Sequence, residues 1–591
     1  MLKRFFISML GTVAGVFLSG VLAVFVILGV IGVVAGKSLS SSSGLEKNSI
    51  LHLKLDGELT ERLTTPTLMD IVQGNVGGTI ALDELRSALE KAAGDSKIEG
   101  VYIDCGSFAG GVAGCEELAA YIREFKEKSG KWVYAYSDSY SQGAYMVATT
   151  ADSLFVNPMG EVDVHGAASL TPFFKDLLDK VGVSMQIIKV GTYKSAVEPF
   201  ILNEMSEPAR RQQQEYIDSI WNFMAGAIAQ GRDIEVSTVK MWADSMCSTW
   251  KLDRTIADGL ADAAVYRRLM EQRLRRLTDR ADDENLRLVS PAEYLAAAGN
   301  PFDAVDKSGK PHVALLYAVG DIVDSGKGGI VGEEMVPEII ALADDDNVEG
   351  MVMRVNSGGG SAFASEQIWE ALEYFKSKGK PLYVSMGDYA ASGGYYISCG
   401  ADCIYADATT LTGSIGVFGM IPEASKLLND KLGVHFTTVQ SNPNASFPVV
   451  FNPMTPAQHA AMQNGVDNIY SIFTQRVADG RDLPVDSVRS IAEGRVWVGT
   501  SALRLGLVDK IGGVKDAIAA IIADNNLPDE VVAYPRDDEN KWMAILRESK
   551  ALEEMKAMAG YSPLERKAME IARNLMEQNP MQARMPMTII R

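Results

Sequence analysis

The chain has 591 residues, of which 47% are hydrophobic and 22% are charged, an ordinary balance for a globular protein. Its length is too great for one hydrophobic core and predicts about two to four domains. The formal net charge of −20 argues against a nucleic-acid partner and against a surface that binds anionic lipid.

An uncharged apolar run lies near the N-terminus. Residues 5–35 contain no charged side chain, and about 20 apolar residues are enough to span a bilayer. The apolar core of a cleaved signal peptide has only about 7–15 residues, so an uncleaved anchor is the favoured interpretation. Lys3 and Arg4 precede the run, and the positive-inside rule then predicts a single-pass protein with its body outside the cytoplasm. Residues 1–49 are therefore predicted to be an anchor and a Ser/Gly tether.

The rest of the chain contains an internal duplication. QGAYMVATTADSLFVNP (142–158) matches SGGYYISCGADCIYADA (392–408), and several other segments match at the same spacing of about 250 residues. A duplication of this length indicates two similar domains. The predicted boundaries are an N-terminal repeat at 50–270, a helical connector at 271–311, a C-terminal repeat at 312–527 and a C-terminal helical tail at 528–591.

Each repeat is predicted to be an α/β domain. Short apolar runs rich in β-branched and aromatic residues alternate with amphipathic helical stretches, which predicts a largely parallel sheet covered by helices. Ligands of such sheets bind at the carboxyl ends of the strands. Ser392 follows the predicted strand PLYVSM (381–386), so it lies at that edge.

Ser392 is the candidate nucleophile. Gly393 and Gly394 follow it, which leaves room for a substrate carbonyl to approach the hydroxyl. The first repeat has Gln142 at the corresponding position, so the small neighbours are shared and the hydroxyl is not. This asymmetry indicates one chemically active repeat.

Lys194 is the candidate general base. None of the five histidines lies in a familiar motif, so a histidine triad has little support. The second repeat has Ala445 near the place of Lys194, so one repeat carries the serine and the other the lysine. Lysine acts as a base only when neutral, which requires a pKa about 3 units below its ordinary value of about 10.4. The sequence therefore predicts a buried Lys194 within hydrogen-bond reach of Ser392.

The predicted oxyanion hole is made by backbone N–H groups. The segment RVNSGGGS (354–361) ends a predicted strand in three glycines, and Gly359 and Gly393 are the chosen donors. A Gly-rich turn with no ligand is an equally simple interpretation. The five cysteines form no CxxC pair and are interpreted as small buried hydrophobic residues, so no metal is predicted.

Four motifs together resemble those of the signal peptide peptidase A family in its long, duplicated form. They are RVNSGGGS (354–361), YAASGGYYIS (389–398), LTGSIGVFG (411–419) and GTYKSAVEPF (191–200). The resemblance implies two tandem Clp-protease/crotonase-like repeats and a Ser/Lys peptidase, with Ser392 as nucleophile, Lys194 as base and Ser414 orienting the lysine amine. Gly358 stands where many family members have proline.

The resemblance also implies a cellular role. Members of the family degrade cleaved signal peptides and other short apolar peptides, without a cofactor, at the periplasmic side of the bacterial inner membrane. They assemble as rings, so a homo-oligomer, with a tetramer favoured, is expected here. Tyr395, Tyr396 and Phe418 are the candidate lining of an apolar substrate pocket.

Two other functions stay open at this stage. A crotonase-like acyl-CoA enzyme would use paired N–H donors and would not need Ser392. A non-catalytic, membrane-tethered ring scaffold would need neither Ser392 nor Lys194. The division of serine and lysine between the repeats favours the peptidase over both.

Overall fold

The computed structural model of the chain describes residues 45–63, 78–299, 309–326, 328–534, 581–585 and 589–590. The predicted membrane anchor, residues 5–35, lies outside these ranges. Within them, no helix has the length and apolar character that crossing a membrane requires.

The first repeat is built around a seven-stranded sheet with the order β2-β1-β3-β4-β5-β8, in which β9 also pairs with β1. All of its strand pairs are parallel, as the alternating pattern predicted. The strands are β1 (Ser49–Thr60), β2 (Thr79–Ala81), β3 (Ile98–Ala109), β4 (Trp132–Tyr140), β5 (Ser153–Val162), β8 (Ala263–Ala264) and β9 (Leu288–Val289). The helices are α3 (Leu82–Gly94), α4 (Val112–Ser129), α5 (Gln142–Ala148), α6 (Lys175–Val181), α7 (Glu198–Ile201), α8 (Glu207–Arg232), α9 (Val236–Asp244), α10 (Leu252–Ala257), α11 (Arg267–Leu277) and α12 (Pro291–Ala298).

The second repeat has an eight-stranded sheet with the order β19-β17-β15-β13-β10-β21, in which β16 pairs with β15 and β20. Its strand pairs are parallel except for β17 with β19. The strands are β10 (His312–Val319), β13 (Val348–Ser357), β15 (Leu382–Ala391), β16 (Cys403–Ala406), β17 (Leu411–Gly413), β19 (Val496–Val498), β20 (Lys510–Ile511) and β21 (Val531–Tyr534). The helices are α13 (Gly332–Asp344), α14 (Ala362–Ser377), α15 (Gly393–Ser398), α16 (Pro456–Arg481), α17 (Val485–Ile491), α18 (Gly499–Arg504) and α19 (Val514–Asn525).

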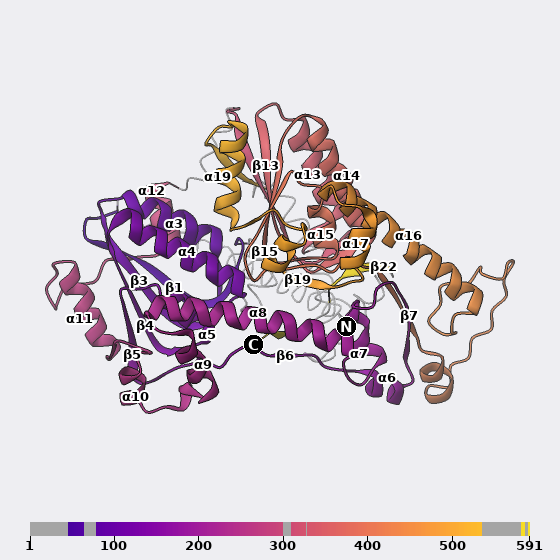
Figure 1. The fold of residues 1–591 in the computed structure, drawn as a ribbon, viewed down its shortest axis with the longest axis horizontal. Helices are drawn as coiled ribbons and strands as arrows, with labels where there is room; N and C mark the ends of the chain where they lie inside the picture. The colour runs from indigo at the N-terminus through magenta and orange to yellow at the C-terminus, as the bar shows by residue number, and fades with distance from the viewer. Residues whose placement is uncertain are drawn as a thin grey trace, which may run out of the picture.

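A third sheet joins the two repeats (Figure 1). Its order is β12-β11-β14-β22-β18-β7, and β7 is the strand that comes from the first repeat. β7 runs antiparallel to β18 over six residue pairs. The strands are β7 (Ser184–Lys189), β11 (Ile322–Val323), β12 (Ile330–Val331), β14 (Gly359–Ser361), β18 (Phe418–Glu423) and β22 (Met581–Arg584). A separate pair joins β6 (Ser169–Leu170) to β23 (Ile589–Ile590).

A buried ionic cluster also holds the repeats together. Arg354 on β13 is fully buried, and its guanidinium donates to Glu61 at 2.9 Å and to Glu117, both from the first repeat. Asp388 accepts hydrogen bonds from the backbone N–H groups of Ala113 and Gly114, at 3.0 and 3.3 Å. Buried charges are tolerated when they are paired and hydrogen-bonded, so this cluster fixes how the repeats meet.

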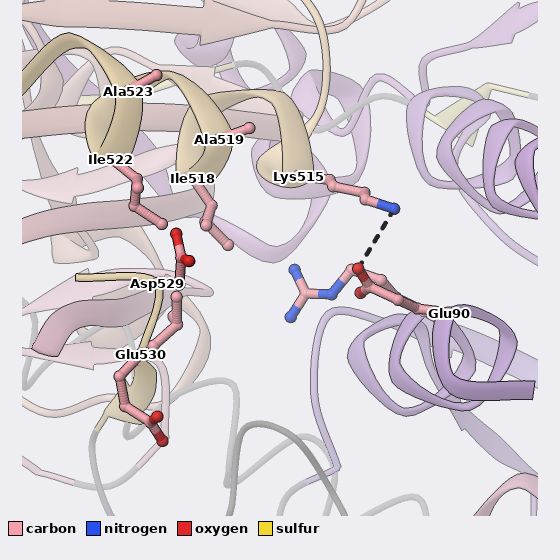
Figure 2. A pocket seen from close by; sticks show the side chains of 10 residues that line it. Glu90, Lys515, Ile518, Ala519, Ile522, Ala523, Asp529 and Glu530 are labelled. Carbon is pink, nitrogen blue, oxygen red and sulfur yellow. Dashed lines mark ion pairs between the residues drawn. The ribbon is translucent and has the colours of Figure 1, made fainter. Parts of the chain in front are cut away.

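A cavity of about 770 Å³ opens between α3 of the first repeat and α19 and β21 of the second (Figure 2). An ion pair of 3.6 Å between Glu90 and Lys515 crosses it, and Ile518 and Ile522 give it an apolar wall. None of its lining residues belongs to the predicted catalytic set.

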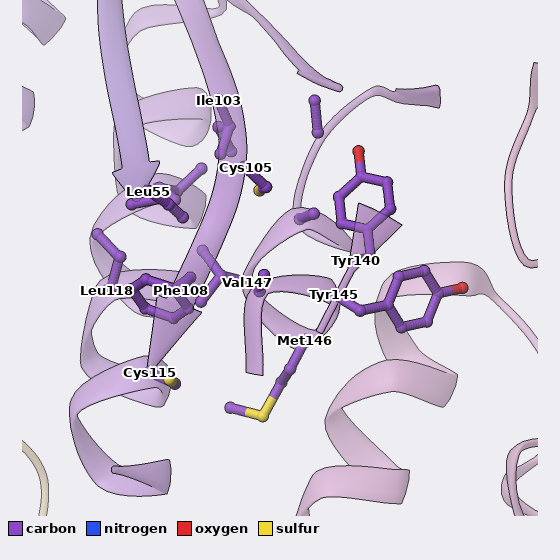
Figure 3. Close-up of a cluster of buried hydrophobic side chains, with 14 of the residues drawn as sticks. Leu55, Ile103, Cys105, Phe108, Cys115, Leu118, Tyr140, Tyr145, Met146 and Val147 are labelled. Carbon is purple, nitrogen blue, oxygen red and sulfur yellow. The ribbon is translucent and has the colours of Figure 1, made fainter. Parts of the chain in front are cut away.

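The cysteines of the first repeat are part of its hydrophobic core. Cys105 and Cys115 lie among the side chains of Leu55, Phe108 and Leu118 (Figure 3). All five cysteines of the chain are buried and free, which confirms that they act as small hydrophobic residues.

The described residues of the C-terminal tail contribute the short strands β21, β22 and β23. Each of them pairs with a strand edge that lies far away in the sequence. The helix predicted from about residue 540 onward falls on residues outside the described ranges. The predicted α/β class of both repeats is confirmed.

Candidate active site

Ser392 lies on a strained turn between β15 and α15. Its backbone has φ 58° and ψ −113°, a conformation that residues other than glycine rarely adopt. Its N–H donates to the carbonyl of Gly413 at 2.8 Å, and the residue is fully buried. A side chain at Gly394 would come within 2.6 Å of the Ser357 carbonyl, so the turn requires glycine there. These features hold the hydroxyl at the carboxyl end of the sheet, as in other nucleophile turns.

Lys194 reaches this turn from the first repeat. β7 pairs with β18, and the loop after β7 then docks on the loop that carries Gly494. The N–H of Tyr193 donates to the carbonyl of Glu493 at 2.9 Å. A Cβ atom added to Gly494, whose φ is +74°, would lie 2.6 Å from Lys194 Cβ. Only glycine therefore permits this close approach.

The side chains of Lys194, Ser392 and Ser414 meet. Lys194 Nζ lies 2.7 Å from Ser392 Oγ, and it lies 3.1 Å from both the hydroxyl and the carbonyl oxygen of Ser414. A neutral amine has two N–H donors and one lone pair. Its N–H groups can donate to the two Ser414 oxygens while the lone pair accepts from Ser392. An uncharged amine can make all three contacts, and an ammonium can make them through its three donors, so burial decides between the two forms.

The buried surroundings of Lys194 favour the uncharged form. Lys194 is fully buried, and this burial lowers its pKa well below the ordinary lysine value. Desolvation penalises the charged amine, and no acidic side chain in the described ranges counters that effect. A lysine in this state can accept a proton near neutral pH.

Ser414 is itself held by its neighbours. Its φ is 50°, its N–H donates to the carbonyl of Arg495 at 2.7 Å, and its hydroxyl lies 3.4 Å from the Gly494 carbonyl. The hydroxyl can thus accept from the lysine while it donates to Gly494. Neither Gly494 nor Arg495 was predicted from the sequence, because both contact Ser414 about 80 residues earlier and Gly494 also contacts Lys194, about 300 residues earlier.

The backbone N–H groups of the two predicted oxyanion donors differ in their hydrogen bonding. Gly359 has φ +99°, and its N–H donates to Ser357 Oγ at 3.1 Å, so this N–H is engaged within the protein. Gly393 is the first residue of α15, where a backbone N–H has no intrahelical acceptor.

The three predicted pocket residues do not lie in the same surroundings. Tyr395 is buried with its hydroxyl donating to the Leu507 carbonyl at 2.9 Å, and buried Tyr396 donates to Glu366 and packs on Phe473. Both tyrosines belong to the buried core of the second repeat. Phe418 begins β18, which borders the site, and 5% of its surface is exposed.

In the first repeat, Gln142 stands at the position that corresponds to Ser392. The side-chain oxygen Oε1 of Gln142 accepts from the backbone N–H groups of His165 and Gly166. Its side-chain nitrogen Nε2 donates to the Gly166 carbonyl at 2.8 Å. This amide fills the place of the serine and stabilises the local loop instead.

Comparison with known proteins supports the repeat structure. Residues 125–280 and 374–527 each match the family described as peptidase family S49. Protease 4 of Haemophilus influenzae is 34% identical over 81% of this chain and 79% of its own length. Protease 4 of Salmonella typhi is 33% identical over 82% of this chain and 76% of its own length. The chloroplastic serine protease SPPA of Arabidopsis thaliana is 26% identical over 82% of this chain and 70% of its own length. The resemblance seen in the four motifs is thereby confirmed.

Proposed function

Because the chain belongs to peptidase family S49 and is thereby a serine-type protease, we propose that it cleaves peptides with a Ser392–Lys194 dyad. The observation that carries this proposal is the 2.7 Å contact between Ser392 Oγ and the Nζ atom of a fully buried lysine. The dyad forms within one chain, from one residue of each repeat.

The proposed reaction has two halves. In the first, Ser392 Oγ attacks the peptide carbonyl carbon while Lys194 Nζ takes the hydroxyl proton. The resulting tetrahedral intermediate collapses, the C–N bond breaks, and the lysine gives its proton to the leaving amine. In the second half, water attacks the acyl-enzyme, the lysine takes a proton from that water, and the proton returns to Ser392 as the acid product leaves.

Ser414 and two backbone N–H groups complete the proposed machinery. The Ser414 hydroxyl and carbonyl accept hydrogen bonds from the amine and stabilise the ammonium that forms during attack. The N–H groups of Gly393 and Gly359 are the proposed oxyanion donors. The Gly359 N–H must then exchange Ser357 Oγ for the substrate oxygen.

The proposed substrates are short apolar peptides, including cleaved signal peptides. The basis is the motif resemblance together with the apolar run at 5–35, which would hold the protein at a membrane where such peptides remain. We propose a single-pass protein of the bacterial inner membrane with its body on the periplasmic side, and repeats of the Clp-protease/crotonase-like type. Phe418 stays as a proposed contact for apolar side chains.

A homo-oligomer is proposed because a strand that is paired in the first repeat has an unpaired counterpart in the second. β7 of the first repeat pairs with β18, whereas its counterpart in the second repeat, residues 435–440, lies exposed without a strand partner among the described residues. Val439 is 96% exposed and Phe436 49%. This segment can add to β6, the counterpart of β18, in a second copy. Head-to-tail contacts of this kind form rings when the rotation between copies closes, and the family resemblance favours a closed tetramer.

The decisive experiment compares dyad variants of the purified protein. Ser392→Ala and Lys194→Met should each abolish hydrolysis of an apolar peptide, and Ser414→Ala should lower kcat about 10- to 100-fold with KM unchanged. Ser392→Ala should also lose labelling by a fluorophosphonate. Ser365→Ala is the matched control, since its buried hydroxyl donates to the Ser361 carbonyl within α14. Wild-type turnover by either dyad variant would refute the assignment.

A further inference from the structure

We propose that Arg495 is a positioning residue for the dyad, and that its guanidinium holds the lysine in place by stacking on one aromatic ring from each repeat. The proposal rests on the proposed peptidase function. One ring is that of Tyr193, which directly precedes Lys194 in the loop after β7, called here the lysine loop. The other is that of Trp497 on β19.

Arg495 lies where the two repeats meet. Its guanidinium carbon Cζ is 5.0 Å from the centre of the Tyr193 ring and 4.1 Å from the centre of the Trp497 ring. A cation at these distances over an aromatic ring is attracted by the electrons of the ring face. Because Tyr193 belongs to the first repeat and Trp497 to the second, the Arg495 side chain bridges the repeats at the residue next to the proposed base.

The backbone of the lysine loop is held by the neighbour of Arg495. The N–H of Tyr193 donates to the Glu493 carbonyl at 2.9 Å, and the N–H of Thr192 donates to the Glu493 carboxylate at 3.3 Å. These bonds leave the Tyr193 ring to be held by side-chain contacts, and Arg495 supplies one of them. Loss of the guanidinium should therefore loosen the loop while its backbone bonds can still form.

The Trp497 ring packs on the turn that holds the nucleophile. A Cβ atom added to Gly413 would lie 3.0 Å from Trp497 Cδ1, and the Gly413 carbonyl accepts the N–H of Ser392 at 2.8 Å. The carbonyl of Arg495 accepts the N–H of Ser414 at 2.7 Å. Arg495 therefore reaches Ser414 through its backbone and the nucleophile turn through Trp497.

Stacking, rather than ion pairing, is expected to carry this role. Arg495 also donates to Glu215 on α8 at 2.5 Å, but the Glu215 side chain is 51% exposed, and exposed ion pairs contribute little. The Nε atom of Arg495 is buried and has no hydrogen-bond partner within the described ranges. Glu215→Gln should accordingly change kcat/KM less than about threefold.

The first repeat lacks this arginine. When Trp250 is matched with Trp497, Ser248 falls where the second repeat has Arg495. The residues two positions before these have left-handed φ angles of 52° and 51°, which supports the match. The arginine is therefore present in the repeat that carries the nucleophile, whereas the tryptophan is present in both.

The pH–rate profile tests the positioning role. Burial lowers the pKa of Lys194, and Glu493 and Arg495, which contact its loop, add nothing to this shift. A loosened loop admits water to the amine, so Arg495→Ala should move the ascending limb of kcat/KM upward by about one pH unit. At neutral pH its kcat should fall about 10- to 100-fold with KM unchanged. Arg495→Lys should behave likewise, because lysine keeps the charge and lacks the planar guanidinium. A wild-type profile in either variant would overturn the proposal.

Variants of the stacked ring test the contact itself. Tyr193→Ala should reproduce the profile of Arg495→Ala, and Tyr193→Phe, which keeps the ring, should match the wild type. Because both residues act through one contact, the double alanine variant should be at most about twofold worse than the worse single variant. Arg254→Ala is the matched control, since Arg254 stacks on Trp250 at 3.4 Å and pairs with Asp258. Multiplied losses in the double variant, or an equal shift in the control, would contradict the proposal.

Hydrogen exchange separates this proposal from the proposed function, because it needs no turnover. In a Ser392→Ala background, Arg495→Ala should speed amide exchange in a peptide covering residues 190–195 about tenfold, and Arg254→Ala should not. Unchanged exchange in Arg495→Ala would overturn the positioning role even where the dyad assignment stands. Wild-type turnover by Lys194→Met would instead refute the dyad, and with it the role of Arg495, even where exchange responds as expected.

Discussion

Lys194 Nζ and Ser392 Oγ lie 2.7 Å apart although 198 positions separate the two residues in the chain. The contact exists because β7 leaves the first repeat and pairs with β18 of the second. Catalysis should therefore depend on the docking of the repeats as strictly as on the two side chains.

The first prediction concerns the pH dependence of hydrolysis. Lys194 must be uncharged to accept the serine proton, and burial holds its pKa well below the ordinary lysine value. The value of kcat/KM should rise with pH through this lowered pKa and reach a plateau well below about 10.4, the pKa of a free lysine. The measurement is a pH–rate profile on an apolar peptide. An ascending limb near the free-lysine value would contradict the role of burial.

The second prediction concerns stability. The unfolded chain binds a proton at Lys194 that the folded chain releases, so the free energy of unfolding should increase with pH up to the ordinary lysine pKa. Lys194→Met removes this cost. The variant should be inactive yet more stable than the wild type by about 1–3 kcal/mol at neutral pH, by analogy with other buried charges replaced by apolar groups. Urea denaturation at several pH values checks this, and the difference should shrink as the pH rises toward about 10.

The third prediction uses two glycines with the same backbone strain. Gly494 has φ +74° and Gly506 has φ +75°, but only at Gly494 would a Cβ atom strike Lys194. Gly494→Ala should lower kcat/KM about 100-fold, because a displacement of about 1 Å is enough to misalign a catalytic group. Gly506→Ala meets only ordinary contact with Leu483, so it should cost about 1 kcal/mol of stability from its backbone strain alone and keep its activity. Equal activities in the two variants would show that the Gly494 contact does not position the lysine.

The division of the site between the repeats was predictable because the duplication itself is informative. Gln142 and Ala445 stand where the partner repeat has Ser392 and Lys194, so each repeat serves as an internal comparison for the other. The contact of Gly494 with Lys194 could not be predicted in this way, since a lone glycine after a helix is common. The hydrogen bonds of Tyr395 and Tyr396 could not be predicted, because their acceptors, the Leu507 carbonyl and Glu366, are brought near only by folding.

The strand β22 could not be found from the sequence for a related reason. Its four residues have too little pattern to predict a strand, and the two edges that they join lie more than about 150 residues earlier in the chain. The conformation of such a segment depends on the strands that it pairs with and not on the local propensity of its residues.

The last prediction tests the cluster that docks the repeats. Burial alone would raise the pKa of Glu117, but the Arg354 guanidinium and a hydrogen bond from Tyr121 hold that pKa below its ordinary value. Arg354→Met leaves Glu61 and Glu117 buried without a counter-charge, and should lower the free energy of unfolding by about 3–5 kcal/mol at neutral pH. Urea denaturation measures the loss, and peptide hydrolysis should fall with it in urea concentrations that the wild type tolerates.

The pH dependence of the free energy of unfolding distinguishes uncompensated buried charge from lost packing as the cause of the destabilisation. In Arg354→Met, burial should raise the pKa of Glu117, because the counter-charge is gone, so the penalty should fade as the pH drops toward about 4.3, the ordinary glutamate value. Adding Glu61→Gln and Glu117→Gln to Arg354→Met removes the charges and should recover most of the stability at neutral pH. A deficit that stays constant with pH, or a triple variant as unstable as Arg354→Met, would mean that shape and not charge is what the cluster contributes to docking.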